Sequence, residues 1–262
     1  MGYFNFTNKV AIVTGGGGGI GRAASLKLAM GGAKLVIVDL HEERGMKVVN
    51  EIKEDGGDAI FIKTDVTKEE DVKNYVQATI DRYKKIDIFL NNAGWLGEVV
   101  PLVDYPVDVF DRVMDINVRG VFLGLKYVLP HMMAQKSGAI VNTASAAGLL
   151  GTPNLVAYGA SKHAVLGMTK SAGVEAAPHG VRVNAICPGG VDTSMLDSVV
   201  FGYSKGNAEE AELKRMAIKA SSPDGRYADP EEIANLMLYL VSDLSSHIVG
   251  QHIVIDGGAI LT

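Results

Sequence analysis

The sequence has little of what secreted, membrane-spanning or nucleic-acid-binding proteins need. Its 262 residues hold one cysteine, so no internal disulfide can form and we expect a reducing compartment, the cytoplasm. No apolar run approaches the ~18 residues of a membrane span, and the start MGYFNF resembles neither a signal peptide nor a myristoylation site. Basic residues number 25 against 30 acidic ones without a dense run, which argues against nucleic-acid and membrane partners. No spacing typical of a metal site is present, so we expect no metal.

What the sequence does contain is a series of short β-branched runs separated by longer amphipathic stretches. Their apolar residues are nearly continuous, as in strands covered on both faces, which is typical of parallel sheets. Strict alternation of strand and helix predicts a doubly wound α/β domain over residues 1–262. The expected strands are 9–14, 34–39, 59–63, 86–90, 138–145, 181–187 and 252–256, and the main helical stretches are 68–83, 107–134, 158–177 and 230–242.

The segment at 194–228 breaks this alternation. Glycines interrupt two weakly helical pieces, and the five basic and five acidic side chains of the segment cancel in formal charge. A long excursion inside a compact domain is usually a lid or a binding loop. We therefore expect a small substrate lid here.

Five consecutive glycines, 15–19, lie between the first expected strand and the first expected helix. A flexible linker does not belong there, whereas glycines at that point allow a sharp turn and a close approach of a pyrophosphate to the helix N-terminus. Gly15, Gly19 and Gly21 form G-x-x-x-G-x-G, and Asp39 ends the second strand 18 residues after Gly21. A carboxylate at about that offset accepts hydrogen bonds from ribose hydroxyls. The pattern predicts a Rossmann-type fold binding NAD(H), with NADP(H) disfavoured by the negative charge.

A second group of residues carries acid–base chemistry. Tyr158 and Lys162 lie four apart on one helix face, and Ser145 ends the strand just before that helix. A surface Tyr–Lys pair is the plain alternative. Beside a dinucleotide, however, a tyrosine can exchange the hydroxyl proton of an alcohol, a neighbouring ammonium and a positive nicotinamide favour its phenolate, and a serine can hold the substrate oxygen.

In combination these motifs resemble the short-chain dehydrogenase/reductase family over nearly the whole chain, from Lys9 to Gly258. The motifs are TGGGGGIG (14–21), DV (65–66), NNAG (91–94), the asparagine of MDINVRG (114–120), NTAS (142–145), YGASK (158–162), PGGVDT (188–193) and DGG (256–258). The stretches NVRGVFLGLKYVLPHM and IVNTASAAG look most similar to NAD-linked enzymes of cyclic or aryl secondary alcohols and ketones. The resemblance implies a single Rossmann domain with a seven-stranded parallel sheet.

The resemblance also implies roles for individual residues. Tyr158 is the implied acid/base, Lys162 lowers its pKa, Ser145 orients the substrate, and Asn117 holds a water in the proton relay. The implied cofactor-binding residues are Gly15, Gly19, Ile20, Gly21, Asp39, Leu40, Asp65, Val66, Asn92, Ala93, Gly94, Tyr158, Lys162, Pro188, Gly189, Val191 and Thr193. We expect Trp95 to narrow the mouth of the pocket or to pack under the lid. Glycines at 16–18 should make the turn before the first helix less preorganised.

The apolar first turn of the lid predicts an uncharged, hydrophobic substrate. Met195, Leu196 and Val199 are the candidate pocket residues beside Ser145 and Trp95. The alternative is that these lid side chains only dock the lid on the body. A 3-oxoacyl-thioester reductase or a sugar or steroid dehydrogenase stays open as an alternative. So does a regulator that senses NAD(H) without turnover. Resemblance to the family further implies a homotetramer.

Overall fold

A computed structural model describes residues 4–205 and 207–262; residues 1–3 of the expected domain and Gly206 of the expected lid lie outside this range. Strands and helices alternate as the apolar runs predict. The strands are β1 (Val10–Thr14), β2 (Lys34–Asp39), β3 (Ala59–Lys63), β4 (Ile88–Asn91), β5 (Gly138–Thr143), β6 (Val181–Pro188) and β7 (His252–Ile255). The helices are α1 (Gly19–Met30), α2 (Glu42–Glu54), α3 (Glu69–Tyr83), α4 (Val107–Met114), α5 (Gly120–Gln135), α6 (Val156–Ala176), α7 (Ser194–Ser204), α8 (Ala208–Ala220) and α9 (Pro230–Val241).

The seven strands form one parallel sheet in the order β3-β2-β1-β4-β5-β6-β7. The order reverses between β1 and β4, so the crossovers from β1 and from β4 run to opposite sides of this point. Ligands of open α/β sheets bind at the carboxyl ends of the strands beside such a switch point. The fold therefore places the expected site at the ends of β1, β4, β5 and β6.

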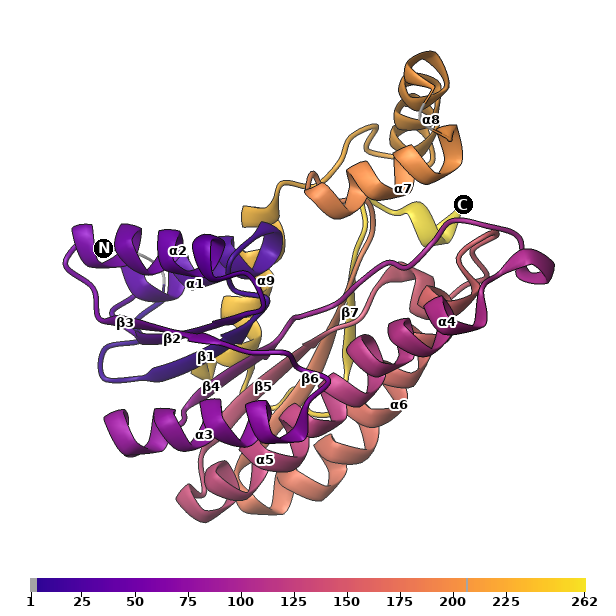
Figure 1. The fold of residues 1–262 in the computed structure, drawn as a ribbon. Coiled ribbons are helices and arrows are strands. Elements are labelled where there is room, and N and C mark those ends of the chain that lie inside the picture. Colours follow the sequence, from indigo (N-terminus) through magenta and orange to yellow (C-terminus); the bar gives the residue numbers. More distant parts are fainter. Residues whose placement is uncertain (1–3, 206) are drawn as a thin grey trace.

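Helices cover both faces of the sheet, as doubly wound folds require (Figure 1). One core lies under α1, α2 and α9, and the other lies under α3, α5 and α6. The inner strand β1 is buried along its whole length and contributes Val13 to the first core and Ile12 to the second. Burial on both faces explains why the strands read as continuous apolar runs rather than as alternating ones.

The expected helix at 107–134 is interrupted. Residues Asp115–Arg119 form a π-helical turn between α4 and α5. The buried positions Val113, Asn117 and Val121 keep a helical spacing and no proline interrupts it, so the sequence pattern does not reveal the turn. A π turn inside a helix frequently marks a functional site, and this one contains Asn117.

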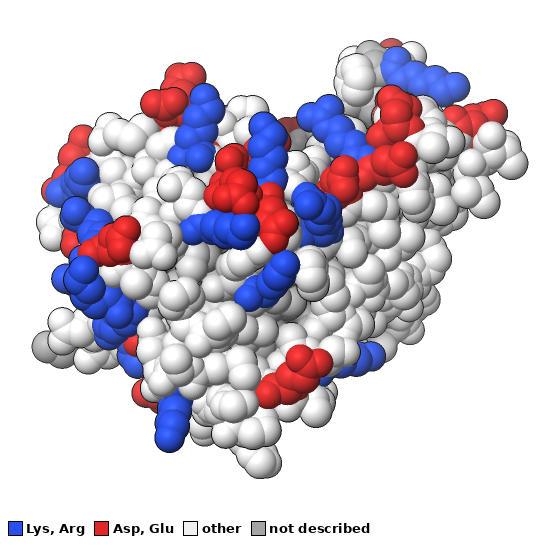
Figure 2. All heavy atoms as spheres, turned by 60° about the horizontal axis from the view of Figure 1, so that its bottom comes forward, with Lys and Arg blue, Asp and Glu red and all other residues white. Residues whose placement is uncertain are grey.

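The segment at 194–228 forms two helices outside the sheet and its covering layers, α7 and α8, and α8 projects away from the domain (Figure 1). Elsewhere on the surface, Figure 2 shows basic and acidic side chains interspersed over one face rather than gathered by sign. Within residues 4–205 and 207–262, no helix combines the length and the apolar character needed to cross a bilayer.

Candidate active site

The glycine loop turns sharply from β1 into α1 and leaves almost no space for side chains. Gly15 and Gly19 have positive φ values, +62° and +48°. A methyl group on Gly21 would overlap the Gly15 carbonyl oxygen, and one on Gly17 would come within 2.9 Å of Asp39 Oδ2. The glycines at 16 and 17 thus fit the close packing of this turn, and only Gly18 faces open space. The first-turn amides of α1 lie at this turn, an arrangement that suits a pyrophosphate.

Asp39 lies at the end of β2 and shapes the same loop. Its Oδ2 accepts a hydrogen bond from the Gly17 amide at 2.9 Å, and its Oδ1 accepts one from the His41 amide at 2.9 Å. Each carboxylate oxygen keeps a further lone pair for a ribose hydroxyl. Arg44, which was not among the expected site residues, also lies here: its Cβ is 3.0 Å from the position that a Cβ on Gly17 would occupy. A basic residue in the first turn of α2 gave no recognisable motif.

Asn92 joins the ends of three strands at the switch point. Its Nδ2 donates to the Thr14 carbonyl at 3.2 Å, and its Oδ1 accepts from the Thr143 hydroxyl at 3.0 Å. The Thr14 hydroxyl in turn accepts from the amides of Asn92 and Ala93, at 2.9 and 3.1 Å. The NNAG motif therefore fixes the glycine loop relative to β4 and β5.

The expected acid–base residues meet at the next strand ends. Lys162 Nζ lies 5.4 Å from the centre of the Tyr158 ring and donates to the Thr143 carbonyl at 2.7 Å. Ser145 follows β5, and its hydroxyl oxygen accepts from the Ala147 amide at 3.2 Å. A methyl group on Gly94 would lie 3.5 Å from Lys162 Nζ. The structure thus brings the tyrosine, the lysine and the serine together beside the NNAG segment.

Burial dominates the proton affinities of this cluster. It raises the pKa of Tyr158 to about 12, while the Ser145 hydroxyl acts in the opposite direction. Burial lowers the pKa of Lys162 to about 8, with Cys187 raising it slightly. We expected the ammonium to favour the phenolate, but within the chain alone desolvation outweighs any such effect. Tyr158 is therefore protonated at neutral pH, the form that donates a proton to a carbonyl oxygen.

Asn117 acts as a structural clamp in the π turn. Its side chain is fully buried; Oδ1 accepts from the Trp95 amide and Nδ2 donates to the Trp95 carbonyl, both at 2.8 Å. Nδ2 also donates to the Ser161 hydroxyl at 3.0 Å, and Ser161 donates to the Tyr158 carbonyl at 2.7 Å. Both amide hydrogens of Asn117 are thus used within the chain. Any water that Asn117 binds must use the remaining lone pair of its oxygen or its backbone.

An apolar cluster packs around the Tyr158 side chain. Leu96, Ala147 and Leu155 pack with Tyr158, and Val99, Met195 and Val199 pack against them. Met195 Sδ lies 3.9 Å from Tyr158 Oη, so α7 reaches the reactive group directly. Leu96, Val99 and Leu155 were not among the expected pocket residues. The position of Leu96 directly after NNAGW was the available signal.

Several other expected site residues lie outside the cluster around Tyr158. The Trp95 ring packs against the Arg112 guanidinium at 4.9 Å, on α4. Leu196 is buried but lies outside the cluster around Tyr158, and Leu40 is half exposed at the end of β2. Asp65 Oδ1 accepts from the Thr67 amide and hydroxyl, which shapes the turn after β3.

The segment after β6 approaches the glycine loop. A methyl group on Gly19 would lie 3.2 Å from Thr193 Cγ2. Pro188 is buried at the end of β6, and the Gly189 amide donates to the Ile255 carbonyl at 3.0 Å. Residues 188–193 therefore run from the sheet edge past the glycine loop into α7.

The fold and the cluster define a dinucleotide-dependent oxidoreductase site at the switch point of a doubly wound sheet. Comparison with known proteins gives the family. A family model described as "Enoyl-(Acyl carrier protein) reductase" matches residues 15–259. The chain belongs to the short-chain dehydrogenase/reductase family and is an oxidoreductase acting on CH–OH groups.

Relatives of known name support the same assignment. The chain is 38% identical to a cyclohexanol dehydrogenase of Acinetobacter sp. (strain SE19) over 252 residues, 96% of this chain and 95% of the relative. It is 40% identical to a levodione reductase of Leifsonia aquatica over 255 residues, 97% and 94% of the two chains. It also resembles the crystal structure of an NAD⁺-bound xylitol dehydrogenase, with a TM-score of 0.93, 39% identity, and coverage of 97% and 99%.

Proposed function

We propose that the protein interconverts a secondary alcohol and a ketone with NAD(H), and that its substrate is neutral and hydrophobic or cyclic. The observation that carries this proposal is the environment of the Tyr158 hydroxyl. The Tyr158 side chain packs among apolar side chains; Met195 Sδ lies 3.9 Å from its hydroxyl oxygen and Lys162 Nζ lies 5.4 Å from its ring centre. The apolar side chains of Leu96, Leu155 and Met195 pack on this side of Tyr158, which favours an apolar substrate group beside the reacting carbon.

The chain offers a fitting cradle for the dinucleotide. The crowded turn at Gly17 and Gly21 and the N-terminus of α1 suit the pyrophosphate, and Asp39 suits the adenosine ribose. Asn92, Gly94 and the residues from Pro188 to Thr193 would line the remaining length. When bound, the nicotinamide supplies the hydride for reduction or takes it up in oxidation.

The chain's own groups would manage the proton and the developing charge. Tyr158 Oη would donate a proton to the carbonyl oxygen in reduction and receive it in oxidation. The Ser145 hydroxyl would donate a hydrogen bond to the same oxygen. Lys162, held by the Thr143 carbonyl, would keep a positive charge beside the phenol and bind the nicotinamide ribose.

The preference for NAD(H) over NADP(H) is supported by Asp39, because a carboxylate at the end of β2 repels a 2′-phosphate. The structural relative with bound NAD⁺ is consistent with this preference. The names of two relatives refer to cyclohexanol and levodione, which are cyclic compounds. This supports a cyclic substrate here.

The lid, the assembly and the location are part of the same proposal. Residues 194–228 would cover the substrate, since Met195 and Val199 pack on the Tyr158 cluster. A homotetramer through α4, α5 and α6 would cover their exposed apolar side chains, among them Val107, Phe122 and Val174. The single cysteine supports a cytoplasmic location.

A steady-state screen tests the function. Oxidation of NADH and NADPH is followed with neutral cyclic ketones, aryl ketones and 3-oxoacyl thioesters, and Tyr158→Phe is the control. We expect turnover with NADH on neutral ketones and a loss of at least about 100-fold in the variant, in line with general acid–base contributions.

The same screen separates the alternatives. Turnover only with thioesters would favour a 3-oxoacyl-thioester reductase. Binding of NADH without turnover on any substrate would favour a sensor and contradict the proposal. Equal turnover by the Tyr158→Phe variant would remove Tyr158 from the chemistry.

A further inference from the structure

The two ends of the lid return to the body at one place. Val191 and Ala228 form a parallel bridge, with hydrogen bonds from the Asp192 amide to the Ala228 carbonyl and from the Ala228 amide to the Gly190 carbonyl, at 3.0 and 2.9 Å. α7 follows the first of these segments directly. The second, Ser221–Ala228, connects α8 to α9, and we call it the return limb.

Glycines of the body leave space for the return limb. A methyl group on Gly190 would lie 3.0 Å from the Tyr227 ring, and one on Gly257 would overlap the Ser222 hydroxyl. Ser222 Oγ donates to the Asp256 carbonyl at 3.1 Å. Gly190 and Gly257 thus allow the return limb to pack closely against the body. This brings the limb next to residues 188–193, the segment expected at the nicotinamide.

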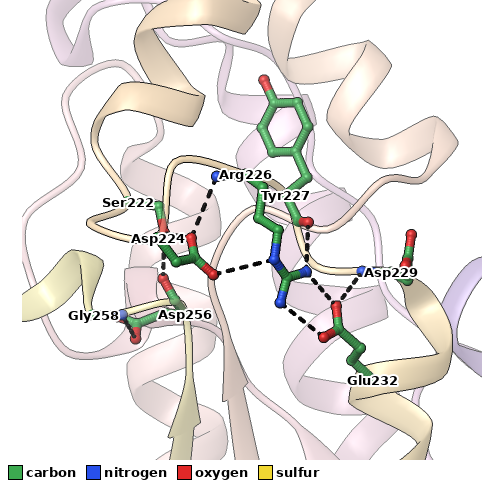
Figure 3. A network of polar contacts seen from close by, with 8 residues as sticks. All are labelled: Ser222, Asp224, Arg226, Tyr227, Asp229, Glu232, Asp256 and Gly258. Atoms are coloured by element: carbon green, nitrogen blue, oxygen red, sulfur yellow. Dashed lines mark hydrogen bonds and ion pairs between the residues drawn. The ribbon is translucent and has the colours of Figure 1, made fainter.

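The guanidinium of Arg226 holds the return limb in this position through ion pairs (Figure 3). Arg226 donates from both terminal nitrogens to the Glu232 carboxylate of α9, at 2.6 and 2.9 Å, and its Nε lies 3.6 Å from Asp224 Oδ2. Glu232 also accepts from the Asp229 amide at 2.9 Å. Bidentate pairs of this kind fix orientation as well as distance.

Tyr227 connects the limb to the lid helices. Its hydroxyl donates to the Arg215 carbonyl of α8 at 2.7 Å, and the Lys219 ammonium lies 5.3 Å from the centre of its ring. α8, described over its full length, has no buried side chain of its own. Its orientation therefore depends on α7 and on such polar ties rather than on a core.

We propose that the return limb is held in one position on the body and thereby sets the orientation of the lid, with Tyr227 and Arg226 as positioning residues for substrate binding. The proposal rests on the proposed function, because it assumes that α7 covers the substrate. Arg226 fixes the limb to α9, Tyr227 transfers that position to α8, and α8 supports α7, which carries Met195. Neither residue belongs to the cluster around Tyr158 or to the glycine loop.

The test compares Tyr227→Phe and Arg226→Gln with Tyr239→Phe, a tyrosine on α9 that is 36% exposed. Tyr227→Phe keeps the ring and removes only the hydroxyl. Three quantities are measured: kcat and KM for a neutral cyclic ketone, the NADH dissociation constant, and the rate of trypsin cleavage in the lid. Cleavage is followed at Lys205, Lys214, Arg215 and Lys219, which every variant keeps; cleavage at Arg226 is left out because Arg226→Gln removes that site.

For Tyr227→Phe we expect KM to rise about fivefold, the net effect of one hydrogen bond. We expect kcat within about twofold of the wild type, an unchanged NADH dissociation constant, and faster cleavage in the lid. Arg226→Gln should act in the same direction and more strongly, and Tyr239→Phe should behave as the wild type. An unchanged KM with unchanged cleavage would overturn the proposal, as would a parallel loss of NADH binding.

Failure of the proposed function remains distinguishable. If the wild type turns over no ketone, the cleavage rates and the NADH dissociation constants of the variants still report the orientation of the lid. Faster cleavage in Tyr227→Phe and Arg226→Gln alone would then support the proposal that the return limb sets the orientation of the lid. Equal rates in all three variants would reject it.

Discussion

Replacement of Asn117 by alanine tests whether this residue acts as a clamp. The side chain is fully buried and makes three hydrogen bonds, two to the Trp95 backbone and one to Ser161. Truncation leaves the partly buried amide and carbonyl of Trp95 without these partners, and such groups cost about 1–3 kcal/mol each. We therefore expect the free energy of unfolding to fall by about 3 kcal/mol.

Asn91 provides the matched control. It is an asparagine with 3% exposure whose side chain donates one hydrogen bond, to the Val121 carbonyl at 3.0 Å. Asn91→Ala should cost about 1 kcal/mol. For a chain of this size about 1 kcal/mol lowers Tm by about 2–4 °C. Thermal unfolding should thus show a loss of about 6–12 °C for Asn117→Ala and a much smaller loss for Asn91→Ala.

Activity measured well below the transition completes the test. The clamp positions the Trp95 backbone and, through Ser161, the helix turn that carries Tyr158. Asn117→Ala should therefore lose both stability and turnover. A variant with the Tm of the wild type and no turnover would refute the clamp and leave only a relay role. Equal Tm losses in the two variants would show that the extra hydrogen bonds contribute nothing.

Two further predictions concern charge. Asp39→Ala should shift the ratio of kcat/KM for NADPH over NADH by at least about tenfold toward NADPH, because a repulsive carboxylate is lost while Arg44 stays nearby; a wild type that already uses both cofactors equally would contradict the argument. Burial holds the pKa of Lys162 at about 8, so its ammonium is present below that pH and is lost as the pH rises through it. The kcat/KM for ketone reduction should therefore fall with a midpoint near pH 8, and a flat profile from pH 7 to pH 10 would contradict the assigned role of the charge.

The sequence predicts the sheet and the grouping of the main site residues, because both follow from local patterns. Continuous apolar runs mark strands buried on two faces, and strand ends in a parallel sheet must meet at one edge. Ser145 and Tyr158 could thus be brought together from their positions relative to one strand and one helix.

The directions of side chains and their hydrogen-bond partners could not be predicted from local sequence patterns. The buried positions on either side of the π turn at 115–119 keep a helical spacing, so nothing in the pattern shows the turn. The turn of Trp95 toward Arg112, and the amides that Asp39 binds, depend on tertiary contacts. The raised pKa of Tyr158 depends on burial, which outweighs the neighbouring ammonium that the sequence made visible.

The bridge between Val191 and Ala228 has a consequence for how substrate range can change. Because the excursion leaves and re-enters the body at one pair of residues, its length and composition are decoupled from the register of the sheet. Lengthening such a closed loop has a small entropic cost, about 0.6 kcal/mol for each doubling. Residues 194–220, which lie beyond Thr193 and before the return limb, therefore form a unit that can be exchanged, and grafting them between relatives should transfer substrate choice while the recipient keeps its own cofactor site.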